Sequence, residues 1–248
     1  MQTPHKITPD CLKDTVVEIR YTSSIPRELT LGVAFGLLTP IGFVYNPVPP
    51  SNLSGVNISL GPNQQVAVGV GGNGGGFFTK GKIRIQLLDN QIKFNCIADN
   101  YVGWNSYIQA IMEVIEQLST KQVIKNFNRI GIRYISEFKD IEIFKNLKGS
   151  IDVEKTGLNL GNAILRLTDE SENMKTFITL TNKGKKRLPQ TQQIIDASLV
   201  DINVYENFDL ISDVNMLKAK LNTLHSKQKD TFFSLISDNF IQTLNPKY

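Results

Sequence analysis

The sequence predicts an α+β protein built from two similar halves, each with antiparallel strands backed by a long amphipathic helix. Two observations support this fold class. The tripeptide Ile-Arg-Tyr ends a predicted strand in each half, at residues 19–21 and 132–134. A long segment with apolar residues at helical spacing closes each half, at residues 104–118 and 214–240. A duplicated unit of strands and a helix is the simplest architecture for this pattern.

The length and composition fit one globular unit in which residues 1–128 and 129–248 form the two halves. The chain has 248 residues, of which 41% are hydrophobic and 20% are charged, as in ordinary globular proteins. No apolar run approaches the roughly 18 residues of a membrane span, and residues 1–14 contain no apolar signal sequence. We therefore expect a cytoplasmic protein without a membrane span. The net charge of +4 permits an anionic partner without requiring one.

The first half contains local patterns that predict a strand, a helix, a hairpin and a second helix. Residues 14–21 alternate in the way expected of a strand. A helix is predicted over residues 29–38, although two glycines weaken it. Residues 82–97 predict a hairpin, because an Asp-Asn pair separates two alternating runs. Trp104 then opens the long helix, either as an anchor in the core, which we favour, or as a ring that stacks on a ligand.

A region rich in glycine and proline, residues 40–81, is predicted as an irregular insertion in the first half. Its glycine run allows positive φ angles and favours a mobile loop. A phosphate-binding loop is the alternative, but that function needs a helix directly after the glycines, whereas residues 82–88 predict a strand. The residues predicted to form the mobile loop are Gly71, Gly72, Gly74, Gly75, Gly76, Phe77 and Phe78.

The central segment, residues 129–138, alternates like a strand and carries two arginines. Arg129 and Arg133 are four residues apart, so they point to the same face, and Arg20 on the first strand completes the candidate site. The favoured interpretation is a structural network in which carboxylates pair with the arginines, because an unpaired buried charge is costly. The alternative is an anion-binding groove between the halves that uses the bidentate arginine fork. The available carboxylates are Glu18, Glu137 and Asp201.

The second half continues with short strands and ends in the longest helical pattern. Residues 140–147 predict a short helix or an extended link, and the strands that follow are predicted at residues 151–153, 163–167, 176–180 and 193–205. A basic turn precedes the last strand; it is either solvated loop charge, which we favour, or a contact for phosphates. The long helix is predicted over residues 210–244, with Asp213 as its N-cap and room for a kink or break at residues 227–229. The basic residues that complete the candidate anion- or partner-binding set are Lys183, Lys185, Lys186 and Arg187.

Several short segments occur in a fixed order along nearly the whole chain. They are Val-Glu-Ile-Arg-Tyr at residues 17–21, Tyr-Val-Gly-Trp at 101–104, Arg-Ile-Gly-Ile-Arg-Tyr at 129–134, and a C-terminal pattern at 201–204, 224–225 and 232–233. In these segments the chain resembles a sporadically distributed family of uncharacterised prokaryotic proteins of similar length. Residues 40–81 depart from the usual pattern of that family. The resemblance carries no established activity, but the patchy occurrence is similar to that of phage-defence, toxin–antitoxin and mobile-element genes.

Motifs for catalysis, metal binding or cofactor binding are not found in the sequence, so we expect no catalytic residue, metal or cofactor. Of the two histidines, His225 is favoured as a packing residue over a catalytic base. The favoured function is a non-enzymatic interaction protein that binds a partner protein, as a component of a phage-defence or toxin–antitoxin-type system. The alternative is a nucleic-acid or nucleotide binder that uses an arginine-lined cleft between the halves. A third possibility is an enzyme that acts through unidentified carboxylates.

Overall fold

The computed structural model describes residues 3–4, 7–8, 10–47, 56–59, 65–68, 76–97, 101–149, 160–171, 173–187 and 191–248. The strands within these residues are β1 (Leu12–Thr22), β2 (Val44–Pro47), β3 (Val56–Ser59), β4 (Gln65–Val68), β5 (Gly76–Lys80), β6 (Ile83–Leu88), β7 (Gln91–Ile97), β8 (Asn126–Lys139), β9 (Ile164–Ser171), β10 (Met174–Arg187) and β11 (Ile194–Ile211). Nine of them form one antiparallel sheet in the order β2-β5-β6-β7-β1-β8-β11-β10-β9, and β3 pairs with β4. The mixed α+β class predicted from the sequence is confirmed.

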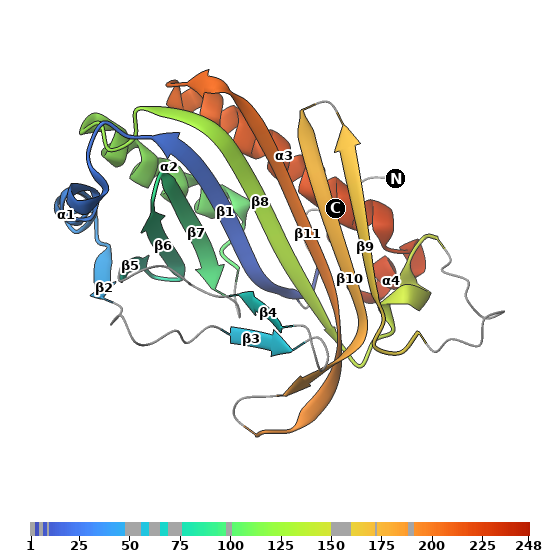
Figure 1. Ribbon diagram of the computed structural model, residues 1–248. Coiled ribbons are helices and arrows are strands. Elements are labelled where there is room, and N and C mark those ends of the chain that lie inside the picture. Colours follow the sequence, from blue (N-terminus) through green and yellow to red (C-terminus); the bar gives the residue numbers. More distant parts are fainter. Residues whose placement is uncertain are drawn as a thin grey trace.

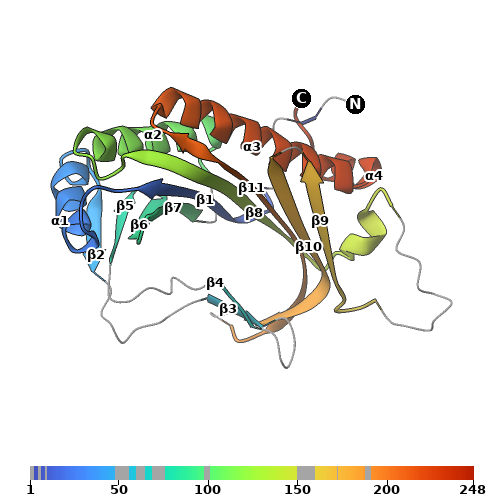
Figure 2. The same cartoon turned by 45° about the horizontal axis from the view of Figure 1, so that its top comes forward.

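The helices gather on one side of the large sheet. They are α1 (Arg27–Leu38), α2 (Trp104–Thr120), the short 3-10 helix η1 (Ile143–Asn146), α3 (Val214–Leu235) and α4 (Asp238–Thr243). Figure 1 shows the strand order and the path of α3 behind the sheet. In Figure 2 the sheet is an arch, with α2 and α3 along its convex side and the β3–β4 pair below its concave side. Within the part of the chain that the structure describes, every helix is too short or too polar to cross a membrane.

The hydrophobic core lies between the convex side of the sheet and the helices. Successive side chains of a strand point to opposite faces, so Ile130 and Ile132 of β8 face the helices and have no exposed surface. Each such side chain contributes about 1.5–3 kcal/mol by leaving water. One continuous cluster contains residues from both predicted halves, and the predicted boundary between residues 128 and 129 falls inside β8. The helix residues that cover the sheet include Ile111, Val114, Ile115, Leu118, Leu217, Leu221 and Leu224.

Elements defined by local sequence patterns agree with the structure. The helix predicted from Trp104 extends only two residues beyond residue 118, and β6 and β7 form the predicted hairpin. Asn90 adopts a φ of 52° in the hairpin turn, a conformation that asparagine tolerates. Asp213 caps α3 as predicted, since its carboxylate accepts a hydrogen bond of 2.8 Å from the backbone N–H of Asn215.

The long C-terminal helix differs from its prediction at both ends. It begins at Val214 because Ile211 still pairs with Phe127, in the last step of the β11–β8 ladder. The helix does not break at residues 227–229, where the sequence left room for a kink or break: α3 is continuous through Gln228 to Leu235. The chain changes direction at Ser237 instead, whose hydroxyl accepts a hydrogen bond from the backbone N–H of Phe240 and caps α4.

The prediction of a mobile loop is wrong for its last three residues. Gly76, Phe77 and Phe78 belong to β5, and Phe78 has no exposed surface because its ring packs 5.1 Å from that of Tyr45. The strands β2, β3 and β4 also lie within the region predicted as irregular. The remaining loop residues (Gly71, Gly72, Gly74 and Gly75) and the strand predicted at 151–153 lie outside the described residues.

The predicted basic turn is also wrong, because residues 183–187 are the end of β10. The β10–β11 ladder continues to the pair Arg187–Ile194 beyond an irregularity between Thr181 and Gly184. Lys183 lies in this irregularity with a φ of 47°, and its backbone N–H donates to the hydroxyl of Ser198 at 3.0 Å. A bulge of this kind places an extra residue in one strand without ending the ladder.

Candidate functional site on the concave face

The concave face of the sheet carries all three arginines of the candidate site. The helices cover the face to which Ile130 and Ile132 point, so the alternating residues Arg129 and Arg133 point the other way. Arg20 of β1 is the direct cross-strand neighbour of Arg129 of β8. The structure therefore brings the three arginines onto one face, on two adjacent strands at the centre of the sheet.

Arg133 forms a bidentate ion pair with Asp201 of β11. Its Nε and Nη2 atoms lie 2.9 and 2.6 Å from the two carboxylate oxygens, the geometry in which arginine and carboxylate interact most strongly. The hydrogen bonding of Arg133 to the Asp201 carboxylate raises the pKa of Arg133 above its ordinary value. Of the predicted carboxylate partners, Asp201 thus pairs with Arg133.

Two further carboxylates occupy the same face. Glu18 accepts a hydrogen bond of 3.2 Å from Arg20, while Lys93 lies 3.8 Å away on its other side. Asp14 is half-buried, and desolvation raises the pKa of its carboxyl, against the opposing effects of Asn95 and of the charges nearby. The concave face therefore has charges of both signs.

Two arginines on this face stack on aromatic rings. The guanidinium of Arg129 lies 4.1 Å from the ring centroid of Tyr205, and that of Arg84 lies 4.1 Å from the centroid of Phe77. Among the described residues, neither Nε atom has a hydrogen-bond partner, although both atoms are buried. Stacking holds each guanidinium in a fixed plane. These two guanidinium groups are thus held in fixed planes on the concave face, and their buried Nε atoms have no partner among the described residues.

Gly131 leaves space beside the ring that supports Arg129. A Cβ atom at this position would lie 3.4 Å from the Cβ of Tyr205, at the short limit of ordinary van der Waals contact. Tyr205 also stacks on Phe177 at 5.7 Å. Near the centre of the concave face, Arg129 therefore stacks on Tyr205, which in turn packs against Gly131 and Phe177.

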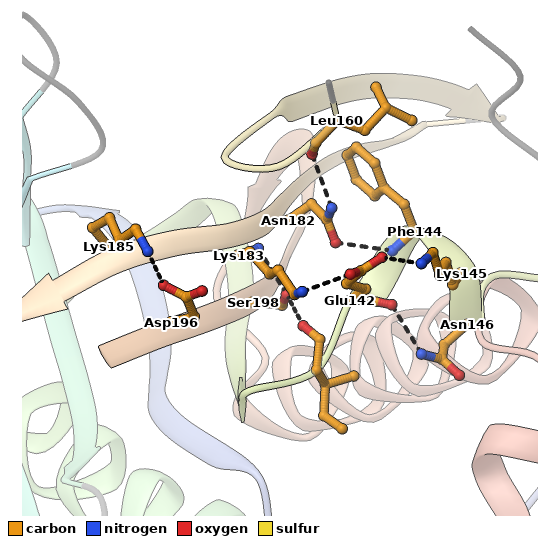
Figure 3. Close-up of polar contacts among 11 residues, drawn as sticks. Glu142, Phe144, Lys145, Asn146, Leu160, Asn182, Lys183, Lys185, Asp196 and Ser198 are labelled. Atoms are coloured by element: carbon orange, nitrogen blue, oxygen red, sulfur yellow. Dashed lines mark hydrogen bonds and ion pairs between the residues drawn. The ribbon is translucent and has the colours of Figure 1, made fainter. Parts of the chain in front are cut away.

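The lysines of the predicted basic cluster all have carboxylate partners, as Figure 3 shows for two of them. Lys183 contacts Glu142 and Lys185 contacts Asp196, each at 2.5 Å. The hydrogen bonds from Lys145 and Lys183 lower the pKa of Glu142 to about 2. Lys186 pairs with Glu137. The end of β10 is therefore a network of paired charges, and Arg187 is exposed at its last residue.

The amide of Asn182 fixes this network to the segment that contains η1. It donates to the backbone carbonyl of Leu160 at 2.9 Å and accepts from the backbone N–H of Phe144 at 3.3 Å (Figure 3). These bonds join β10 to η1 and to the segment that precedes β9, as expected of a structural junction.

Sequence reasoning missed Arg84, Tyr205 and Asp14 as members of the concave face. Arg84 was detectable, because it is a polar residue in an alternating strand, whereas Phe77 was assigned to a loop. Groups of three or more histidine, cysteine, aspartate or glutamate side chains able to hold a metal ion are absent from the described residues. The chain matches no family model, no curated protein and no solved structure.

Proposed function

We propose that this protein is a non-enzymatic interaction protein that binds a partner protein through the concave face of its sheet. The observation that carries the proposal is the pair of stacked arginines, Arg84 and Arg129, whose Nε atoms have no hydrogen-bond partner among the described residues. Arginine and aromatic residues dominate the binding energy at the centres of protein interfaces. Because stacking fixes the guanidinium planes in advance, less side-chain entropy is lost on binding.

The balance of charges favours a protein over a nucleic acid as the partner. Nucleic-acid interfaces carry a large surplus of positive charge, whereas Arg133, Arg20 and the lysines at the end of β10 have carboxylates beside them. The alternative, a nucleic-acid or nucleotide binder that uses Arg20, Arg129 and Arg133, requires these arginines to exchange carboxylates for phosphates. Its affinity would fall steeply with salt, because phosphate contacts release counterions.

The proposal extends to the setting in which the protein acts. The resemblance to a sporadically distributed family suggests a cytoplasmic component of a phage-defence or toxin–antitoxin-type system. In such a system a binding protein acts by occupying its partner, and this role requires a surface and no catalytic group.

We also propose that the chain arose by internal duplication, with a strand, a strand meander and a helix in each half. From the centre outward the sheet runs β1-β7-β6-β5 on one side and β8-β11-β10-β9 on the other. In each series the strand that comes first in the sequence, β1 or β8, is central. The strand that comes last, β7 or β11, pairs with it and is followed in the sequence by α2 or α3. This equal order supports a repeated unit, as does the location of Arg20 and Arg133 on the same face.

The function is tested by affinity capture from an extract of the native cells, with nuclease treatment and mass spectrometry. The wild-type protein is compared with Arg84→Ala, Arg129→Ala and, as a matched control, Lys218→Ala on the exposed side of α3. We expect the wild-type protein to capture one partner protein in stoichiometric amount, also after nuclease treatment. Each arginine variant should lose this partner, and Lys218→Ala should retain it. Equal capture by all four proteins refutes the concave face as the interface. Capture of nucleic acid that dissociates at high salt favours the alternative.

A further inference from the structure

A cavity of about 350 Å³ lies on the opposite side of the sheet from the concave arginines. It is formed where the start of α2, the convex side of β8 and the middle of α3 meet beside the N-terminal segment. Its volume falls within the range of small-molecule sites, which begins at about 300 Å³. We call it the aromatic pocket, and the residues that carry the argument are Tyr101, Trp104, Tyr134, Ser136, His225 and Gln228.

The walls of the aromatic pocket are rings held in fixed orientations. Trp104 and His225 stack in parallel at 4.2 Å, and the indole N–H of Trp104 donates to the side-chain oxygen of Asn222 at 2.8 Å. The hydroxyls of Tyr101 and Tyr134 share a hydrogen bond of 2.5 Å. These contacts join three elements of the fold, so the rings are oriented before any ligand enters. A planar apolar surface is the shape that such walls accept.

Two buried polar side chains line the pocket with no partner. Gln228 is 4% exposed and Ser136 is 5% exposed, and both line the cavity. Among the described residues, no hydrogen bond joins either side chain to another group, and the fully buried polar atoms without a partner do not include theirs, so the amide and the hydroxyl are open to the cavity. A glutamine amide offers two N–H donors and a carbonyl acceptor. An amide that opens onto a cavity can therefore exchange hydrogen bonds with a molecule that enters it.

A third polar group of the pocket, His225, is uncharged at neutral pH, and the charged side chains Asp10 and Lys229 also line the cavity. Burial, and to a lesser degree the charge of Lys229, lower the pKa of its imidazole to about 4. A neutral imidazole offers one donor and one acceptor. The pocket thus combines aromatic walls with the uncharged donors and acceptors of Ser136, His225 and Gln228 and with one charge of each sign.

We propose that the aromatic pocket binds a planar nitrogen heterocycle of nucleobase or nucleoside size. The ring lies among the aromatic walls, and its edge accepts and donates hydrogen bonds with the amide of Gln228. A glutamine amide carries a donor and an acceptor side by side, and it pairs bidentately with an adjacent acceptor and donor, as on the edge of adenine. Ser136 supplies one further hydroxyl. This site is independent of the partner-binding face, because Gln228 and Ser136 are on the helix side of the sheet.

The test uses the only tryptophan of the chain, Trp104, as an internal reporter. Adenosine, guanosine, cytidine and thymidine are titrated into the full-length protein, with indole as an apolar planar probe. Tryptophan emission and isothermal titration calorimetry follow binding in parallel. We expect saturable binding of at least one nucleoside at one site per chain, and weaker binding of indole.

Three variants connect binding to the pocket. Gln228→Leu removes the amide at similar volume, and we expect at least about a tenfold loss of nucleoside affinity with undiminished folding stability, because the amide makes no hydrogen bond to another described residue. Gln228→Glu keeps the shape but exchanges a donor for an acceptor, so it changes the preferred nucleoside. Gln109→Leu, at an exposed glutamine of α2, is the matched control and retains wild-type affinity.

The proposal is overturned if no nucleoside binds saturably by either method. It is also overturned if indole binds as tightly as the best nucleoside, or if Gln228→Leu and Gln228→Glu both keep wild-type affinity and preference. Failure of these titrations leaves the capture experiment with Arg84→Ala and Arg129→Ala unaffected, so the two proposals are refuted separately.

Discussion

Replacing Arg133 with methionine removes a guanidinium that donates two hydrogen bonds to Asp201 and leaves that carboxylate without its main partner. The side chains of the pair are 30% and 20% exposed, so the pair lies between a surface ion pair and a buried one. Exposed pairs contribute roughly 0–1 kcal/mol, and breaking a buried pair costs about 3–5 kcal/mol. We therefore expect Arg133→Met to lower the free energy of unfolding by about 2 kcal/mol.

A double-mutant cycle isolates the part of this cost that belongs to the pair. Asp201→Asn and the variant with both substitutions complete the cycle, and we expect a coupling energy of about 1–2 kcal/mol. Urea unfolding followed by the emission of Trp104 measures all four proteins, and thermal unfolding should shift by about 4–8 °C for Arg133→Met. Native proteins of this size are stable by roughly 5–15 kcal/mol, so the variant remains folded.

The result that refutes this reasoning is a coupling energy near zero with wild-type stability in both single variants. Arg133 would then contribute nothing to the fold, and its bidentate geometry would serve a ligand. If Arg133→Met is destabilised as expected and still captures the partner, the arginine is structural. Arg129, which has no carboxylate partner among the described residues, is then the arginine available for binding.

Two further predictions concern buried ionisable groups. The pKa of His225 falls from 6.5 to about 4 on folding, so the neutral form is favoured in the native state. The contribution of His225 to the free energy of unfolding is therefore fully present above about pH 6.5, and up to about 3 kcal/mol of it is lost as the pH approaches 4. Urea unfolding across this range should give a flatter profile for His225→Asn, and equal profiles contradict the assignment. The side chain of Glu137 is 3% exposed and pairs with Lys186, so Lys186→Met should cost about 3 kcal/mol. Adding Glu137→Gln should restore part of this loss in thermal unfolding, and no recovery would show that the buried charge is not the cause.

The elements predicted well are those whose signals are local. The apolar spacing after Trp104, the Asp-Asn turn of the hairpin and the cap at Asp213 depend on residues within a few positions of one another. The alternation around Arg129 and Arg133 is equally local. Each of these patterns therefore gave the right element, and the last gave the right face.

The errors arise where the partners are distant in the sequence. The lysines at the end of β10 resemble a turn until Glu142, Asp196 and Glu137 are brought beside them by the fold. Phe78 follows a glycine run, and only pairing with β2 and β6 makes it a strand residue. No local pattern contains this information, because it depends on long-range packing.

The aromatic pocket was missed for the same reason. Its members Trp104, Tyr134 and His225 come from three separate segments, and each alone has the pattern of a core residue. Only the three-dimensional structure shows that these three side chains line one cavity.

The central strand β8 contributes to both surfaces, and the alternation of its side chains separates their roles. Arg133 points to the concave face while its neighbour Tyr134 lines the aromatic pocket on the convex side. Because β8 is paired along its length with β1 and β11, its backbone is fixed from both sides. A side chain can then be replaced on one face without moving the other face. The arginine variants and the Gln228 variants are therefore controls for each other. A variant that weakens both partner capture and nucleoside binding has damaged the fold as a whole, whereas a variant that weakens only one has located the surface responsible.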